Sequence, residues 1–227
     1  KEMKTISEKG LLEVEDVHST SKRSNVAISF CCMMLGCCTL LPWNAFLSAS
    51  DFLWQCYPSI KQPELYLTLA FLLVLEVVLT IFALAGERFA TYGLRFSTGF
   101  TLFGIIVSLL PIITTQLTER LSWAVLLVAI GLCGAFEGVV EGCLYSFTLH
   151  EGGSFVAFSQ GGQAASAVII TGARIITKAS FSQTPRGSRT SAYVFWGVSA
   201  ASCFGCIVVL YSIPSIRSRM KNRPGAG

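Results

Sequence analysis

Leu65–Gly86 reads LYLTLAFLLVLEVVLTIFALAG, and this stretch decides the fold because it is apolar throughout and carries one charged residue, Glu76. A helix needs ~20 residues to cross the ~30 Å hydrocarbon core of a bilayer, at 1.5 Å per residue. The stretch lacks the inside/outside alternation of a barrel strand. It therefore predicts a transmembrane helix.

Five further apolar runs flank this stretch in a chain of 227 residues, of which 52% are hydrophobic and 13% charged. They are Asn25–Phe46, Gly93–Ile113, Leu121–Phe147, Phe155–Ala179 and Ala192–Ile213. The sequence thus predicts an all-α polytopic membrane protein with a six-helix bundle over residues 25–213. Polar residues 1–24 are expected to be a disordered cytoplasmic tail, and residues 214–227 a basic cytoplasmic segment.

The distribution of Lys and Arg predicts the orientation of this bundle. Six spans put both termini on one side, where the two terminal segments and the loop between the second and third runs hold eleven cations. These are Lys1, Lys4, Lys9, Lys22, Arg23, Arg88, Arg95, Arg217, Arg219, Lys221 and Arg223. The other side holds Lys61, Arg120, Lys178, Arg186 and Arg189. Both termini are therefore expected in the cytoplasm, and the net charge of +4 reflects topology rather than nucleic-acid binding.

Residues that could carry enzymatic or metal chemistry are sparse. The chain has two histidines, His18 and His150, and neither accompanies a catalytic constellation within a span. Cys203 and Cys206 have the spacing of a metal half-site but no second pair, and the other cysteines fit small membrane residues better than a disulfide framework. We expect no enzyme activity, no metal and no cofactor.

Three acids lie inside predicted spans, where a charge at the bilayer centre costs at least ~2.5 kcal/mol. Glu76 is in the second run, while Glu137 and Glu141 lie one turn apart on one face of the fourth. That face is expected to look into the bundle or a water-filled cavity. Arg174 is expected more than ~10 Å from this pair in depth, so it either snorkels outward with Lys178 or serves in gating or substrate contact. Glu76, Glu137 and Arg174 are our candidates for proton coupling or gating.

Small residues mark the flanks of two runs. Gly134, Gly138 and Gly142 recur at intervals of four in the fourth run, which makes one flank smooth enough for another backbone to approach. The fifth run opens with Gly161 and Gly162. Tight static packing and a rocking motion explain these glycines equally well.

Pro42, Trp43 and Asn44 stand together in the first run. Pro42 removes a backbone donor, so a kink is expected near Cys38. An indole beside a kinked helix suits stacking on a planar ligand, with Asn44 binding that ligand or the neighbouring helix. The alternative is an interfacial tryptophan with a packing asparagine.

These residues belong to a wider set that closely resembles the equilibrative nucleoside transporters, with the plant-type branch nearest. The set runs from the first span to the fifth. It comprises Leu40–Phe46 (LLPWNAF), Ala49–Phe52 (ASDF), Tyr57-Pro58, Val140-Glu141-Gly142, Gly161–Ser166 and Ala173–Ala179 (ARIITKA).

The resemblance implies a major-facilitator-like fold of eleven spans, in which these six helices form the N-terminal half and a nucleoside binds between the halves. The substrate-binding residues that it implies are Leu40, Trp43, Asn44, Leu47, Leu72, Leu75 and Glu141, and it places Glu76 beside the same cavity. The family commonly has Gln where this chain has Glu141. Because a carboxylate accepts hydrogen bonds but does not donate them unless protonated, protonation of Glu141 would couple transport to pH.

The family's later spans carry an Asp/Arg pair that grips the ribose, whereas this sequence runs from Lys1 to Gly227 without such a span. We therefore expect an N-terminal fragment of an alternating-access nucleoside transporter, whose partners are a nucleoside, membrane lipid and a C-terminal half-bundle. The plasma membrane is the expected location, and an organelle membrane fits as well. The alternatives are a half-size assembly or regulatory protein without transport of its own, and a facilitator for nucleobases.

Overall fold

The computed structural model describes residues 2–85, 91–181 and 184–221, with side chains from Asn25 onward. All regular secondary structure in these ranges is helical, which confirms the predicted all-α class. The helices are α1 (Glu2–Ser48), α2 (Ser50–Cys56), α3 (Pro63–Ala85), α4 (Tyr92–Gln116), α5 (Glu119–Glu151), α6 (Ser154–Ser180), α7 (Pro185–Ser212) and α8 (Pro214–Met220).

Each of the six predicted spans corresponds to a long helix. Five stretches of the described chain are long and apolar enough to cross a membrane, namely Asn25–Ser48, Pro63–Leu84, Tyr92–Gln116, Glu119–Glu151 and Pro185–Ser212. The fifth predicted span forms α6, whose 27 residues would also reach across a bilayer. It is more polar than the other five because Gln160, Gln163 and several Gly and Ser residues interrupt its apolar stretch.

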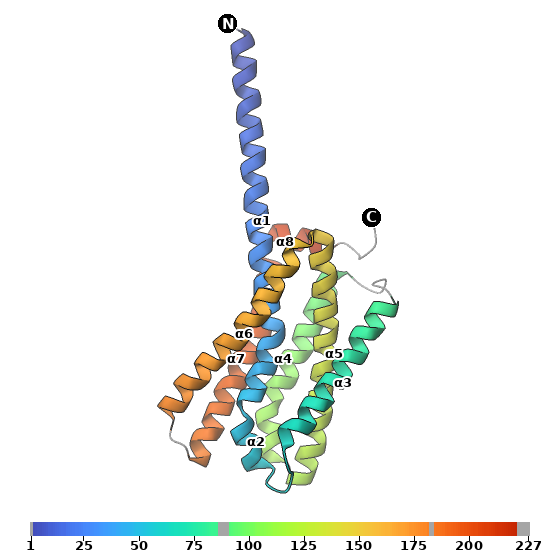
Figure 1. The fold of residues 1–227 in the computed structure, drawn as a ribbon, viewed down its shortest axis with the longest axis vertical. Helices are drawn as coiled ribbons and strands as arrows, with labels where there is room; N and C mark the ends of the chain where they lie inside the picture. Colours follow the sequence, from blue (N-terminus) through green and yellow to red (C-terminus); the bar gives the residue numbers. More distant parts are fainter. Residues whose placement is uncertain (1, 86–90, 182–183, 222–227) are drawn as a thin grey trace.

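The N-terminal segment differs from its prediction. Helix α1 begins at Glu2, so residues 2–24 are helical where the sequence predicts a disordered tail. This segment contains Glu, Lys and Leu, which favour helix, and no Pro to end it. It projects away from the bundle as a continuation of α1 (Figure 1). Lys1, Arg88 and Arg223, which the orientation argument uses, lie outside the described residues.

The long helices run up and down between two ends of one bundle (Figure 1). Helix α1 packs most extensively against α6 and also against α7, α3 packs against α5, and α4 lies between α5 and α7. The N-terminal extension and α8 lie at one end, and α2 with the start of α7 lies at the other (Figure 1). We call the latter the α2 end.

Helix α8 is fixed to the bundle by apolar and ionic contacts. Ile216 and Met220 are buried on one side of this short helix. Arg219 pairs with Glu151 at the end of α5. The basic segment predicted after the last span therefore begins as a helix held against α4 and α5.

Backbone contact between α1 and α6 depends on two glycines. A Cβ on Gly162 would lie 1.9 Å from the carbonyl oxygen of Met33, and one on Gly36 would lie 2.0 Å from that of Ser159. Such distances are impossible for real carbon atoms, so both positions require the absence of a side chain.

The glycine flank predicted on the fourth run is confirmed in part. A Cβ on Gly134 would lie 2.3 Å from the carbonyl oxygen of Phe71, and one on Gly138 would lie 2.9 Å from Val78. Gly142 has only ordinary contacts with α3. The backbone of α3 therefore approaches α5 most closely at Gly134.

We predict that Gly162→Ala destabilises the bundle by roughly 1–3 kcal/mol, because the added methyl group forces α1 and α6 apart. Gly161→Ala is the matched control, since nothing lies within 4 Å of a Cβ at that neighbouring position. Thermal unfolding of the detergent-solubilised protein measures the difference. Equal melting temperatures for the two variants would contradict the close approach.

Candidate functional site

Trp43 lies on α1 within an aromatic stack. Its ring is parallel to that of Phe71 on α3, with centroids 3.9 Å apart and planes at 5°, and the ring of Phe46 lies 5.6 Å away. The residue is 9% exposed. In this conformation protein side chains cover the indole, so its contact with a ligand stays a prediction.

Asn44 joins α1 to α6 beside this stack. Its amide Nδ2 donates to Ser166 Oγ at 2.8 Å, and Ser166 Oγ donates to the backbone carbonyl of Gln163 at 2.7 Å. Of the two roles predicted for Asn44, the structure thus shows the bond to a neighbouring helix. The α1–α6 backbone contact brings Asn44 and Ser166 within reach of each other.

Glu141 continues the same hydrogen-bonded group from α5. Its Oε1 accepts from Gln163 Nε2 at 3.1 Å and from the Tyr145 hydroxyl at 3.3 Å, and that hydroxyl accepts from Gln160 Nε2 at 2.8 Å. We call the connected residues the polar network; its members are Asn44, Gln160, Gln163, Ser166, Glu141 and Tyr145. Asn44, Glu141 and Tyr145 are half-buried, and Gln160 is exposed.

The apolar residues assigned to substrate binding have different environments. Leu40 and Leu47 are half-buried on α1, and Leu75 is buried on α3. Leu72 and Glu76 are exposed on the outer surface of α3. Leu75 therefore belongs to the core, whereas Leu72 and Glu76 are not covered by other parts of the described protein.

Glu137 lies one turn before Glu141 and is 1% exposed. Neither of its carboxyl oxygens has a hydrogen-bond partner among the described residues. Glu137 thus faces the interior, whereas Glu141 is half-buried and reaches the polar network. A role for Glu137 in proton coupling stays a prediction.

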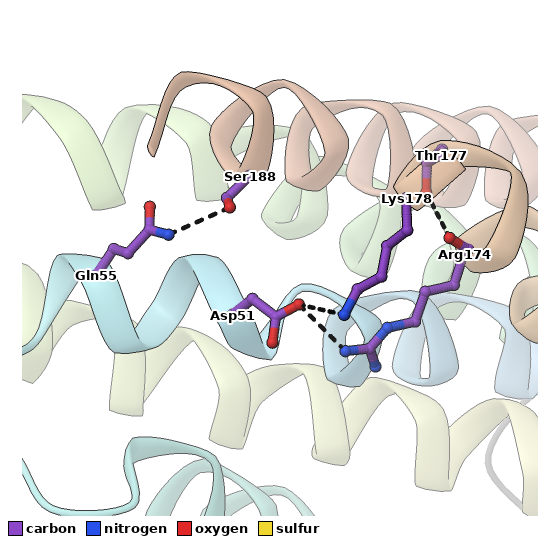
Figure 2. Close-up of polar contacts among 6 residues, drawn as sticks. All are labelled: Asp51, Gln55, Arg174, Thr177, Lys178 and Ser188. Atoms are coloured by element: carbon purple, nitrogen blue, oxygen red, sulfur yellow. Dashed lines mark hydrogen bonds and ion pairs between the residues drawn. The ribbon is translucent and has the colours of Figure 1, made fainter. Parts of the chain in front are cut away.

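Arg174 pairs with a third acid, Asp51 of α2. Arg174 Nη2 donates to Asp51 Oδ2 at 3.3 Å, and Lys178 Nζ donates to the same oxygen at 2.9 Å (Figure 2). Within the described ranges Arg174 forms no ion pair with Glu137 or Glu141. Arg174 and Lys178 thus pair with Asp51 at the α2 end, and the snorkelling, gating and substrate roles considered for Arg174 stay predictions.

The two cations change the ionisation of Asp51. The hydrogen bond from Lys178 is the largest cause that lowers the pKa of Asp51 below its ordinary value of 3.8, and the charge of Arg174 adds to it. Partial burial opposes this shift. Asp51 is therefore ionised at neutral pH and holds both cations there.

No metal site is evident in the part of the chain that the structure describes, where no group of three or more His, Cys, Asp or Glu residues converges. The nine cysteines all lie in the described residues, where none of them forms a disulfide, and most of them are buried.

Several polar residues of the site were missed from the sequence. Gln163 and Tyr145 were not singled out, although an amide inside a predicted span carries a desolvation cost that marks it as a candidate. Asp51 and Ser166 were quoted only as part of the family resemblance. Phe71 could not be recognised as the partner of Trp43, because nothing local distinguishes it from other core aromatics.

The helices and the polar network together define the class of the molecule: it is an integral, multi-pass α-helical membrane protein with a hydrogen-bonded group inside its bundle. A search of protein-family models finds no match. Searches of curated proteins find a set of plant transporters.

Three of these relatives, all from Arabidopsis thaliana, match most of the chain. Equilibrative nucleotide transporter 8 is 32% identical over 195 residues, which cover 83% of this chain and 50% of the relative. Equilibrative nucleotide transporter 7 is 27% identical over 202 residues, covering 88% and 48%. Equilibrative nucleotide transporter 1 is 27% identical over 191 residues, covering 81% and 42%. The predicted family resemblance is confirmed: the chain is a relative of the plant equilibrative transporters, and it spans about half their length.

We predict a small, pH-dependent coupling between Asp51 and Lys178. Because the Asp51 side chain is 51% exposed, the pair is worth ~0.2–1 kcal/mol at pH 7. A lowered pKa means that the stabilisation is complete above pH 3.8 and is lost as pH falls through the lowered value.

A double-mutant cycle with Asp51→Asn and Lys178→Met, measured by unfolding at pH 7 and at about pH 1, tests this coupling. The matched control pair is Asp51→Asn with Arg189→Met, because Arg189 contacts Tyr193 instead. A coupling that is the same at both pH values would contradict the ion pair.

Proposed function

We propose that this chain forms one side of the path by which a nucleoside crosses a membrane, through alternating access with a second half-bundle. Similarity to equilibrative transporters over more than four-fifths of the chain supports this proposal. Because the relatives are about twice as long, the second half-bundle is part of the proposal.

The polar network is the observation that carries the proposal. It joins α1, α5 and α6 and remains partly exposed, although α1 and α5 are long and apolar enough to cross a bilayer. Half-exposed amides and a carboxylate cannot face lipid cheaply, so this face has to meet water, substrate or another protein surface. A nucleoside offers the matching donors and acceptors.

The exposed surface of α3 supports a covering partner. Only 17% of its membrane-crossing stretch is buried, and that surface includes Glu76. A carboxylate in contact with hydrocarbon is costly. A second bundle packed over α3 would remove Glu76 from lipid and close the path between the halves.

The aromatic stack suits a planar base. The Phe46 ring lies 5.6 Å from Trp43 and is tilted by 18°, so it covers the indole less closely than Phe71 does. In our proposal a base enters beside Trp43 on the Phe46 side. Leu40 and Leu47, which lie on the same helix, would border it.

By the charge bias of its loops, we place both termini in the cytoplasm and the α2 end on the opposite side. The charges at the α2 end do not conflict with this placement, because Asp51 pairs with two of its cations.

The proposal is tested by measuring the uptake of labelled adenosine and uridine into cells. The cells express the longest form of the protein that its transcript encodes. Trp43→Ala should lower uptake roughly five- to a hundred-and-fiftyfold, since stacking on a base is worth ~1–3 kcal/mol. Trp54→Ala is the matched control because Trp54 is exposed on α2. Equal uptake by the two variants would count against a base site at Trp43.

The same assay separates the proposal from its alternatives. Preferential uptake of adenine and uracil over their nucleosides would indicate a nucleobase facilitator. No uptake of either class would favour an assembly or regulatory role.

Glu141→Gln tests whether transport follows the ionisation of this residue. Gln still accepts hydrogen bonds from Gln163 and Tyr145 but is uncharged at every pH. We therefore expect uptake by the variant to lose any pH dependence that the unsubstituted protein shows between about pH 5 and 8. Tyr145→Phe is the control, as it removes one hydrogen bond and keeps the carboxylate. A pH profile that survives in Glu141→Gln would exclude Glu141 as the titrating group.

A further inference from the structure

A pocket at the α2 end lies apart from the polar network. Its lining comes from the end of α1, α2, α6 and the first turns of α7, and it includes Asp51, Arg174, Thr177, Lys178, Ser188 and Ser191. Figure 2 shows the acidic and basic side chains meeting between α2 and α6, with Ser188 of α7 beside them. Charged and hydroxyl groups therefore line one part of the pocket, and apolar residues such as Phe52, Phe181 and Ala192 line the rest.

The charges that line this pocket do not balance. One carboxylate, Asp51, faces two cations, and both of them use the single oxygen Oδ2. Arg174 contacts it through Nη2 alone, whereas a guanidinium has five N–H groups and an ammonium three. Arg174 and Lys178 therefore keep N–H donors that Asp51 does not use. Together with Asp51 they carry a net charge of +1.

Solvent can reach these groups. The side chains of Arg174 and Lys178 are 32% and 45% exposed, and that of Asp51 is 51% exposed. A further cation, Arg186, lies on the first turn of α7, whereas Arg189 is held on the ring of Tyr193 and does not line the pocket. An anion that approaches this corner from water therefore meets a positive potential.

We propose that this pocket binds a phosphate oxyanion, which Arg174 and Lys178 hold in competition with Asp51. An arginine fork matches the oxygens of phosphate, and a lysine adds a point charge. When no anion is bound, Asp51 pairs with both cations. The same chemistry is offered by a free phosphate, by the phosphate of a nucleotide and by a lipid headgroup.

Competition with Asp51 gives the proposal a distinctive signature. Removing either cation weakens anion binding, whereas Asp51→Asn strengthens it because the competing charge is gone and the shape is kept. A purely structural ion pair would not produce an improvement. Nonspecific attraction would respond equally to any nearby cation.

The test uses the full chain, purified into phosphatidylcholine nanodiscs and titrated calorimetrically with inorganic phosphate and with AMP at constant ionic strength. Arg174→Gln and Lys178→Gln should each weaken binding roughly ten- to a hundredfold, as expected for a lost charged hydrogen bond. Arg174→Lys should retain part of the affinity. Arg189→Gln is the matched control and should change it little.

A second arm adds phosphatidylglycerol to the nanodiscs and measures thermal unfolding. Binding of free phosphate or AMP identifies a soluble ligand. Stabilisation by phosphatidylglycerol alone, lost in Arg174→Gln, identifies a lipid headgroup, and either result supports the pocket. If Asp51→Asn fails to strengthen binding, if Arg189→Gln weakens it as much as Arg174→Gln, or if neither probe binds, the proposal is overturned.

This proposal does not depend on nucleoside transport. Adenosine carries no phosphate, so its uptake and the effect of Trp43→Ala report on the polar network and the aromatic stack. Uptake of adenosine without phosphate binding would overturn only the anion site. Phosphate binding without adenosine uptake would leave the anion site and count against the proposed function.

Discussion

The backbone contact between α1 and α6 is the constraint on which the rest of the structure depends. Gly36 and Gly162 allow two membrane helices to touch without intervening side chains. In hydrocarbon there is little hydrophobic gain from helix association, so close packing and interhelical hydrogen bonds have to supply it. The same contact brings Ser166 to Asn44, and from there the hydrogen bonds extend to α5. The α1–α6 backbone contact therefore accounts both for the packing of these helices and for the polar network.

The two polar groups of the molecule differ in their surroundings and thus in their chemistry. The polar network lies among helices that cross the bilayer, where each donor needs an acceptor. The Asp51 group lies at the α2 end, half-exposed, where charges can separate at little cost. A neutral, planar molecule suits the first environment, and an anion suits the second.

The sequence predicted the helices well because the length of each apolar run matches the thickness of a bilayer. It also predicted that Glu137 and Glu141 share one face of α5, since their spacing fixes a common face, and Glu137 is buried there. It did not predict the pairing of Arg174 with Asp51, because these residues are more than a hundred positions apart and only the packing of α2 against the bundle brings them together. The tail was expected to be disordered from its polarity, but helix propensity extends α1 through it.

The stack of Trp43 on Phe71 has an optical consequence. The indole of α1 is shielded from water by a ring that α3 supplies. Any separation of these two helices would hydrate the indole and shift its emission to longer wavelength. With Trp54, Trp123 and Trp196 replaced, this indole would therefore be an intrinsic fluorescent reporter of the distance between α1 and α3.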